Sequence, residues 1–288
     1  MADWLIRSLT GHAEQITACD PRRNRLIAKD SDKDDPIDAA KLAQLLRGGY
    51  LKPVHHGDSW ERTLFKRHVA LYHDRVRQRV REANRMMAYL RRFGIFVRER
   101  SVADPQKRME WMETLPKDEI IRFHVDLLLS GYDAAAHQVL QMRRRLVQLS
   151  KGHEPILRFV ELPGVHWIRA ATFFVYLDTP FRFPSKSALW KYIGVGLERR
   201  RSGGGSERVR VAAYANRILK SAILGAAKSA IASGKNPFAD QYERWMDGGL
   251  TPRTARRNVA RSQAATMWSM WKHGSVYDPR RVGGTTAS

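Results

Sequence analysis

Cysteine is almost absent from this sequence: the 288 residues include only Cys19. One cysteine excludes an intrachain disulfide framework and a zinc site built from cysteines. This scarcity favours a reducing, intracellular setting, and we expect a cytoplasmic protein.

Long apolar runs are also missing. No stretch reaches the roughly 18 consecutive apolar residues that a membrane-spanning helix needs. The first residues, MADWLIRSLTGH, are too short and too polar for a signal peptide. We therefore expect no membrane partner.

Acidic residues are few relative to basic ones. The chain has 51 Lys and Arg against 29 Asp and Glu, which gives a formal net charge of +22 and a pI of about 10.6. Residues 1–50 hold eight of each sign, so the whole excess lies in residues 51–288. Such an excess indicates a polyanionic partner, and DNA or RNA is the obvious class.

Residues 1–50 look like part of an α/β unit. A short amphipathic helix is expected over 2–9 and is ended by Gly11, and QITAC at 15–19 is a strand candidate. One strand cannot form a sheet, so the other strands are either borrowed or lie upstream.

Two aspartates open the next predicted helix, which runs over 37–47 with Asp35 as its cap and Pro36 in the first turn. Asp35 and Asp38 are three residues apart and share a face of that helix. Capping and the helix dipole explain the pair in purely structural terms. The functional interpretation is a pair of carboxylates aimed at a divalent metal ion.

Residues 51–154 are expected to form a helical arm. Apolar residues recur at helical spacing over 59–98 and again over 117–150, with a short helix near 109–112 between them. Two long helices joined in this way predict an antiparallel hairpin or coiled coil. The arm can act as a spacer or dimer contact, and its basic face can follow a nucleic-acid backbone.

Residues 155–275 are expected to form an all-α domain. It opens with Leu162-Pro163-Gly164-Val165 followed by a helix, a pattern similar to a helix-hairpin-helix turn, in which backbone N–H groups meet a DNA phosphate. Helices follow at 187–193, 211–233, 237–246 and 252–272. The helical spacing of Trp245, Trp268 and Trp271 favours core positions over base-stacking platforms. A disordered tail is expected over 276–288.

The stretch Leu197–Arg210, LERRRSGGGSERVR, has the most unusual composition in the chain. Glycines allow close approach of the backbone to a ligand, and arginines match phosphate with a planar fork of donors. A serine in such a loop can reach a phosphodiester, although a flexible basic linker has the same composition. The candidate residues here are Arg199, Arg200, Arg201, Ser202, Gly203, Gly204, Ser206, Arg208 and Arg210.

Several separated motifs together are similar to one family. The stretch 33–43, KDDPIDAAKLA, resembles the signature K-x-D-x-x-D-A-x-x-L-A, and Leu162–Val165, Phe181–Ser185, Gly194–Leu197, Arg201–Gly204 and Asn216–Lys220 resemble the C-terminal domain of the same family. The family is the DEDD transposases of bacterial insertion sequences, the insertion-sequence-110 group and its 1111 branch. Their order is a RuvC-like domain, a coiled coil and a C-terminal transposase domain.

The resemblance implies a function. Such enzymes recombine DNA with the guidance of a structured bridge RNA, four acids hold Mg²⁺, and a serine attacks the DNA phosphate. Asp35 and Asp38 match the last two acids, and Ser202 matches the serine, with Ser206 as the alternative. The turn at Gly164 and Val165, the arginines and glycines of 199–210, and Asn216 and Arg217 would contact nucleic acid. The family also implies dimers that pair into tetramers, in a bacterial cell near the nucleoid.

The chain departs from the family pattern at two places. The first two acids would lie before Met1, so the resemblance predicts a RuvC-like remnant over 1–50 that lacks its first strands. Ala215 stands where the family has a glycine. The sequence therefore predicts a mainly α protein that is a DNA transposase by descent. The alternative is a non-catalytic remnant that dimerises and binds nucleic acid.

Overall fold

The computed structural model describes residues 2–19, 35–51, 53–55, 57, 59–200, 208–211 and 215–282. The chain divides into two units, residues 1–59 and residues 60–288. The described part is mainly helical, in agreement with the predicted fold class. None of its helices combines the length and the apolar character needed to cross a bilayer.

The first unit contains helices α1 (Ala2–Leu9) and α2 (Asp35–Arg47). The strand predicted over 15–19 is not formed: the described residues there make only an isolated bridge between Cys19 and Pro53, with the Val54 N–H donating to the Ala18 carbonyl at 2.8 Å. A strand needs a partner along its length, and the described part of this unit supplies one residue pair. A RuvC-like sheet is thus not seen in these residues.

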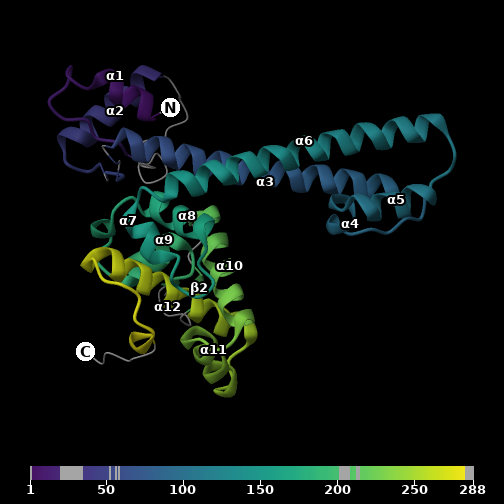
Figure 1. Ribbon diagram of the computed structural model, residues 1–288. Helices are drawn as coiled ribbons and strands as arrows, with labels where there is room; N and C mark the ends of the chain where they lie inside the picture. The colour runs from purple at the N-terminus through teal and green to yellow at the C-terminus, as the bar shows by residue number, and fades with distance from the viewer. Residues whose placement is uncertain are drawn as a thin grey trace. The chain divides into compact units, whose positions relative to one another are not determined.

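The second unit begins with a helical hairpin. Helices α3 (Trp60–Arg91) and α6 (Glu119–Ser150) run antiparallel side by side, as the sequence predicted, and α4 (Glu99–Ala103) and α5 (Pro105–Glu113) lie at the end where the chain reverses (Figure 1). This end has its own small core, which includes Met86, Leu90, Val102, Trp111 and Val125. Arg108 joins α5 to α6 by a forked contact with the Asp133 carboxylate, at 2.8 Å for Nη1.

The other end of the hairpin continues into a helical domain. Its elements are α7 (Glu154–Phe159), α8 (Trp167–Leu177), α9 (Lys186–Ile193), α10 (Arg217–Ser233), α11 (Pro237–Asp247) and α12 (Pro252–His273), with the strands β1 (Leu197–Arg200) and β2 (Arg208–Val211) and the 3-10 turns η3 (Pro180–Arg182) and η4 (Pro279–Arg281). The sequence places a domain boundary at residue 154, whereas in the structure α3, α6 and α8 share one hydrophobic core across it.

Helix α8 is the centre of this core. Every residue from Ala170 to Leu177 is buried, because α3, α6, α7 and α10 all pack against it. The contacts include His73, whose Nε2 bonds the Thr172 hydroxyl at 2.9 Å, and Phe174, whose ring lies 4.9 Å from that of Trp271. Trp268 is also buried and donates its indole N–H to the Pro180 carbonyl. The predicted core position is confirmed for Trp268, while Trp245 and Trp271 are partly buried and pack against the same core.

The segment 276–282, predicted to be part of a disordered tail, is instead packed on the domain. Tyr277 stacks on Phe238 with 6.3 Å between ring centroids, Asp278 caps η4, and Val282 is buried. The prediction was wrong because it relied on local polarity, whereas an aromatic and a β-branched side chain here complete a core formed by distant helices. Residues 283–288 lie outside the described residues.

Candidate nucleic-acid interface

The Pro-Gly turn between α7 and α8 has a structural cause. Gly164 has φ of +76°, and a Cβ there would collide with the backbone of α10 at the Ala226 carbonyl and the Ala230 nitrogen. Only glycine allows both the left-handed backbone and this close approach of a helix. The sequence singled out Gly164 for its turn, and the structure adds that the turn is held against α10.

Val165 is not available for the role that the sequence predicted. Its N–H donates to the Leu162 carbonyl at 3.0 Å, and its side chain is 1% exposed. An N–H already bonded within the turn does not bind a phosphate as well, so this part of the prediction was wrong. The open donors are one turn further along, where α8 begins: the N–H groups of Trp167 and Ile168 donate to no described residue.

Arg169 lies beside these open donors. Its Nη1 donates to the Gly164 carbonyl at 2.6 Å and to the Ser229 hydroxyl at 2.9 Å, and burial lowers the pKa of Arg169. No carboxylate in the described part of the chain pairs with it. A half-buried cation without an acidic partner, next to the positive end of a helix, is a favourable place for a phosphate or another anion.

The stretch that the sequence treated as a loop is in part a β-hairpin. Strands β1 and β2 pair antiparallel, with Leu197 opposite Val211, Arg199 opposite Val209 and Arg200 opposite Arg208. The alternating R-V-R-V of 208–211 was the signal that could have predicted a strand. The candidates Arg199, Arg200, Arg208 and Arg210 lie in these strands. Residues 201–207, with Arg201, Ser202, Gly203, Gly204 and Ser206, lie outside the described residues.

Asn216 and Arg217 open helix α10. The Asn216 side chain accepts from the Leu219 N–H at 3.0 Å, so it is an N-cap whose acceptor is in use. Arg217 is exposed, with no ion pair to a described residue, and remains free to meet a phosphate. Ala215, where the family has glycine, is accommodated because its neighbour Gly194 has no Cβ: a Cβ at that position would overlap that of Ala215.

A row of arginines on α12 was missed by the sequence analysis. Arg253, Arg257 and Arg261 recur every four residues, which places them on one face of the helix. Burial, followed by the neighbouring Arg253, lowers the pKa of Arg257, and burial, followed by Arg257, lowers that of Arg261. None of the three pairs with an acid among the described residues. The i, i+4 spacing was visible in the sequence and could have identified this row.

Asp35 and Asp38 lie in the first turn of α2, as predicted, but Asp35 is the first helical residue rather than a cap outside the helix. Both belong to the first unit, while Arg169, Arg217 and the α12 row belong to the second. Over the described ranges, no group of three or more acidic, histidine or cysteine side chains is placed to hold a metal ion. The acid pair is therefore a partial ligand set at most within these residues.

The second unit thus defines a class: a mainly helical domain with one β-hairpin that carries unpaired arginines near an open helix start, suited to holding a polyanion. Residues 157–243 match the sequence model of the family described as "Transposase IS116/IS110/IS902 family". The matched segment runs from α7 to α11 and includes the Pro-Gly turn, the β-hairpin and the start of α10. Over this segment the chain is similar to the IS110 family of transposases. No curated protein matches the chain.

Proposed function

We propose that this chain acts on DNA as a transposase that cleaves and rejoins strands, with a structured RNA as its guide. The observation that carries the proposal is the family match over 157–243, the segment that contains the open start of α8 and Arg169. The excess of 22 positive charges suits a protein that holds both DNA and RNA.

The DNA backbone is held, in this proposal, by the turn before α8 and by the start of α10. The free N–H groups of Trp167 and Ile168 point along the helix axis toward an incoming anion, and Arg169 adds a fixed charge beside them. Arg217 adds an exposed charge. A helix-hairpin-helix role for 154–177 rests on these groups rather than on Val165.

Asp35 and Asp38 are the proposed metal ligands. Two carboxylates three residues apart on a helix suit Mg²⁺, which is commonly bound by one or two carboxylates and keeps several waters. A bound metal ion would neutralise phosphate charge and favour ionisation of a nearby hydroxyl. Asp35 is exposed and Asp38 is half-buried, which leaves the pair accessible to a DNA phosphate.

Ser202 is the proposed nucleophile, with Ser206 as the alternative. The serine oxygen bonds to the phosphorus, the bond from phosphorus to a sugar oxygen breaks, and that oxygen leaves with a proton. Arginines in the flanking strands stabilise the charge that develops on the phosphate. A second strand's hydroxyl then displaces the serine and rejoins the DNA.

The test is a strand-transfer assay with Mg²⁺, the element's end sequences and its RNA. We expect Ser202→Ala and Asp35→Asn each to lower the rate at least about 100-fold, while Ser206→Ala changes it little. A covalent protein–DNA adduct on a denaturing gel should disappear with Ser202→Ala. Full activity of Ser202→Ala would refute the nucleophile. Steeply salt-dependent binding with no cleavage by the unmutated chain would favour the non-catalytic alternative.

The hairpin is proposed to join copies of this chain. Ile120, Phe123 and Leu127 are exposed on one face of α6, and Phe96 and Met109 are exposed in the segment that connects the two long helices. Such exposed apolar side chains mark an interaction surface. We expect a dimer or larger oligomer by light scattering, and a smaller mass for Phe123→Glu. Arg122→Glu, an adjacent exposed residue, is the control.

A further inference from the structure

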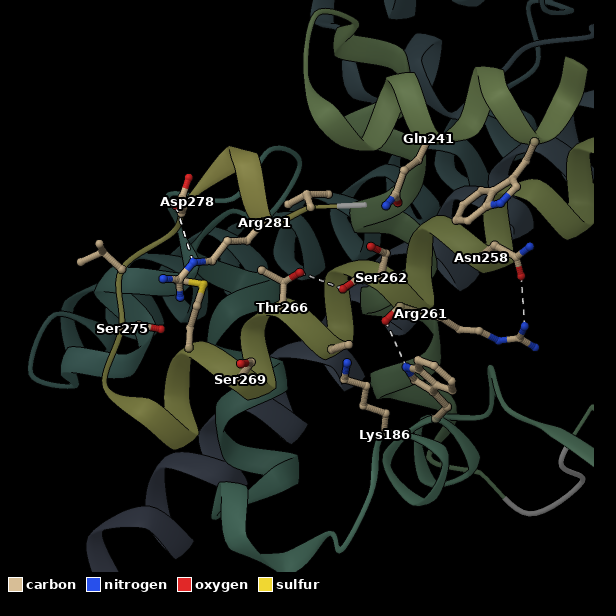
Figure 2. Close-up of a pocket in the computed structure, with 16 residues that line it drawn as sticks. Lys186, Gln241, Asn258, Arg261, Ser262, Thr266, Ser269, Ser275, Asp278 and Arg281 are labelled. Atoms are coloured by element: carbon tan, nitrogen blue, oxygen red, sulfur yellow. Dashed lines mark hydrogen bonds and ion pairs between the residues drawn. The ribbon is translucent and has the colours of Figure 1, made fainter. Parts of the chain in front are cut away.

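A pocket of about 500 Å³ opens between α9, α11, α12 and the segment 275–282 (Figure 2). Its volume is within the range of small-molecule and cofactor sites. The pocket is separate in sequence from the turn before α8, from the acid pair and from Ser202. Its lining combines three kinds of group: a buried amide without a hydrogen bond to the described residues, two indole rings and three cations.

Gln241 is the most informative residue of this lining. It is 6% exposed, yet neither atom of its amide has a hydrogen bond to any described residue, and its Oε1 is fully shielded. Figure 2 shows the side chain extending from α11 toward Ser262 on α12. The Oε1 is shielded within the fold, so the amide Nε2 is the group of Gln241 left to bond a ligand at the pocket. A donor at this position suits an acceptor on the edge of a nucleobase.

Two tryptophans supply flat apolar surface. Trp190 and Trp245 both line the pocket and are partly buried. The Trp190 indole N–H donates to the Arg261 carbonyl at 3.0 Å, which fixes the orientation of that ring. The Trp245 N–H has no acceptor among the described residues. Aromatic faces stack nucleobases with little regard to sequence.

The charge of the pocket is positive. Lys186, Arg261 and Arg281 line it together with one carboxylate, Asp278. Arg281 lies 3.6 Å from that carboxylate through its Nε. Arg261 bonds only neutral acceptors, Val195 O at 2.7 Å and Asn258 Oδ1 at 3.0 Å. Lys186 is exposed and pairs with no acid in the described residues. A ligand with a phosphate group would balance this excess.

We propose that this pocket binds one unpaired nucleotide of a nucleic-acid strand. Its base stacks on Trp190 or Trp245, Gln241 reads the base edge, and Lys186 and Arg281 hold the phosphate. A base within a duplex has its edge occupied and its faces stacked, so it does not enter. The proposal relies on the proposed function only in taking nucleic acid as the partner; it requires no cleavage.

The test measures binding of the full chain to labelled single strands of about ten nucleotides, as RNA and as DNA, and to the corresponding duplex. Gln241→Leu keeps the volume but loses the amide, and we expect about tenfold weaker binding of the single strand with unchanged duplex binding. Of the two single strands, the one that binds more tightly identifies the source of the nucleotide. The melting temperature of Gln241→Leu should equal or exceed that of the unmutated protein, which shows that it folds.

Two neighbouring arginines provide a matched control. Arg280 and Arg281 both contact Asp278, but only Arg281 lines the pocket. Arg281→Ala should weaken single-strand binding several-fold more than Arg280→Ala does. Equal losses, or unchanged single-strand affinity in Gln241→Leu, would refute the pocket while leaving the DNA function intact. If the chain binds no nucleic acid of any kind, both proposals fail together.

Discussion

Helices α2 and α8 differ in what their apolar residues contact. In α8 every residue from Ala170 to Leu177 is buried, because four neighbouring helices pack against it. In α2 no residue is buried, and Ile37, Leu42 and Leu46 are exposed.

An apolar stripe therefore stabilises a helix only where other elements cover it. The described residues of the first unit supply no such cover. Each carboxylate at the start of α2 interacts favourably with the positive end of the helix dipole. That interaction stabilises the helix by only about 0.3–1 kcal/mol per carboxylate. The second unit therefore holds the stability of the described chain, while the first presents its acids and apolar side chains on open surface.

The largest expected consequence is a difference in proteolysis. Trypsin should cut after Arg47 in α2 on the order of 10³ times faster than after Arg169 in α8, because cleavage requires local opening and α2 has no core to lose. Timed digestion followed by mass spectrometry measures both sites. Comparable cleavage rates at the two sites would show that α2 is as well packed as α8 and would refute the difference in packing.

The second consequence is specific to the packing around α8. Gly164→Ala forces a side chain into the α10 backbone and should lower the free energy of unfolding by about 3 kcal/mol or more. Gly94 has the same φ of +76° but no atom within 4 Å of an added Cβ. Gly94→Ala should therefore cost only about 1 kcal/mol. Denaturant unfolding followed by tryptophan fluorescence compares the two, and equal losses would mean that contact with α10 is unimportant.

A third consequence concerns acid stability of the same core. Burial lowers the pKa of His73 to about 4, with a smaller contribution from Arg77. The unfolded chain binds a proton near pH 6.5 and the folded chain does not, so stability is complete above pH 6.5 and is lost as the pH falls toward 4. The loss attributable to His73 should approach about 3 kcal/mol at pH 4.

His73→Asn should flatten the pH dependence of unfolding between pH 6.5 and 4, although its absolute stability is lower. Some slope remains, because burial also lowers the pKa of His153. An unaltered slope in His73→Asn would show that this histidine is protonated as readily in the folded state as in the unfolded state.

The sequence predicted those parts of the fold that local signals determine. The helix predicted over 187–193 is found as α9 from Lys186, and the Ser185 side chain caps it by accepting from the Ala188 N–H at 3.2 Å. The helices that begin at Pro237 and Pro252 were found at their predicted starts, because proline favours the first turn. The long hairpin followed from helical periodicity over more than thirty residues in each helix.

Other failures depended on contacts between residues distant in the sequence. The packing of Tyr277 on Phe238 and the burial of Val165 each need a partner that the local sequence does not reveal. The strand at 208–211 and the arginine row on α12 had local signals that were overlooked. The candidate site shows the same division. Gly164 was found from its turn, whereas the unpaired state of Arg169 and of Gln241 is known only once their neighbours are placed. Ser202 lies outside the described residues, so its role stays a prediction.

The smallest expected change in stability concerns the first residues of α2 and α10. Asp35 and Asn216 both lie at helix starts, but Asn216 is an N-cap, with its Oδ1 3.0 Å from the Leu219 nitrogen. Asn216→Ala should cost about 1 kcal/mol of stability, because one donor of α10 loses its acceptor. Asn216→Asp keeps an acceptor at this position and should leave the stability nearly unchanged.

The two substitutions separate capping from nucleic-acid contact. Because a carboxylate repels a nearby phosphate, Asn216→Asp weakens DNA binding only if the start of α10 lies against the backbone. Arg217→Ala, one residue later, should then make the slope of log binding constant against log salt concentration less steep. The change should be about that of one lost phosphate contact. If Asn216→Asp binds DNA as tightly as the unmutated chain at low salt, Asn216 has a structural role alone, and the interface is confined to the turn before α8 and the arginines of α12.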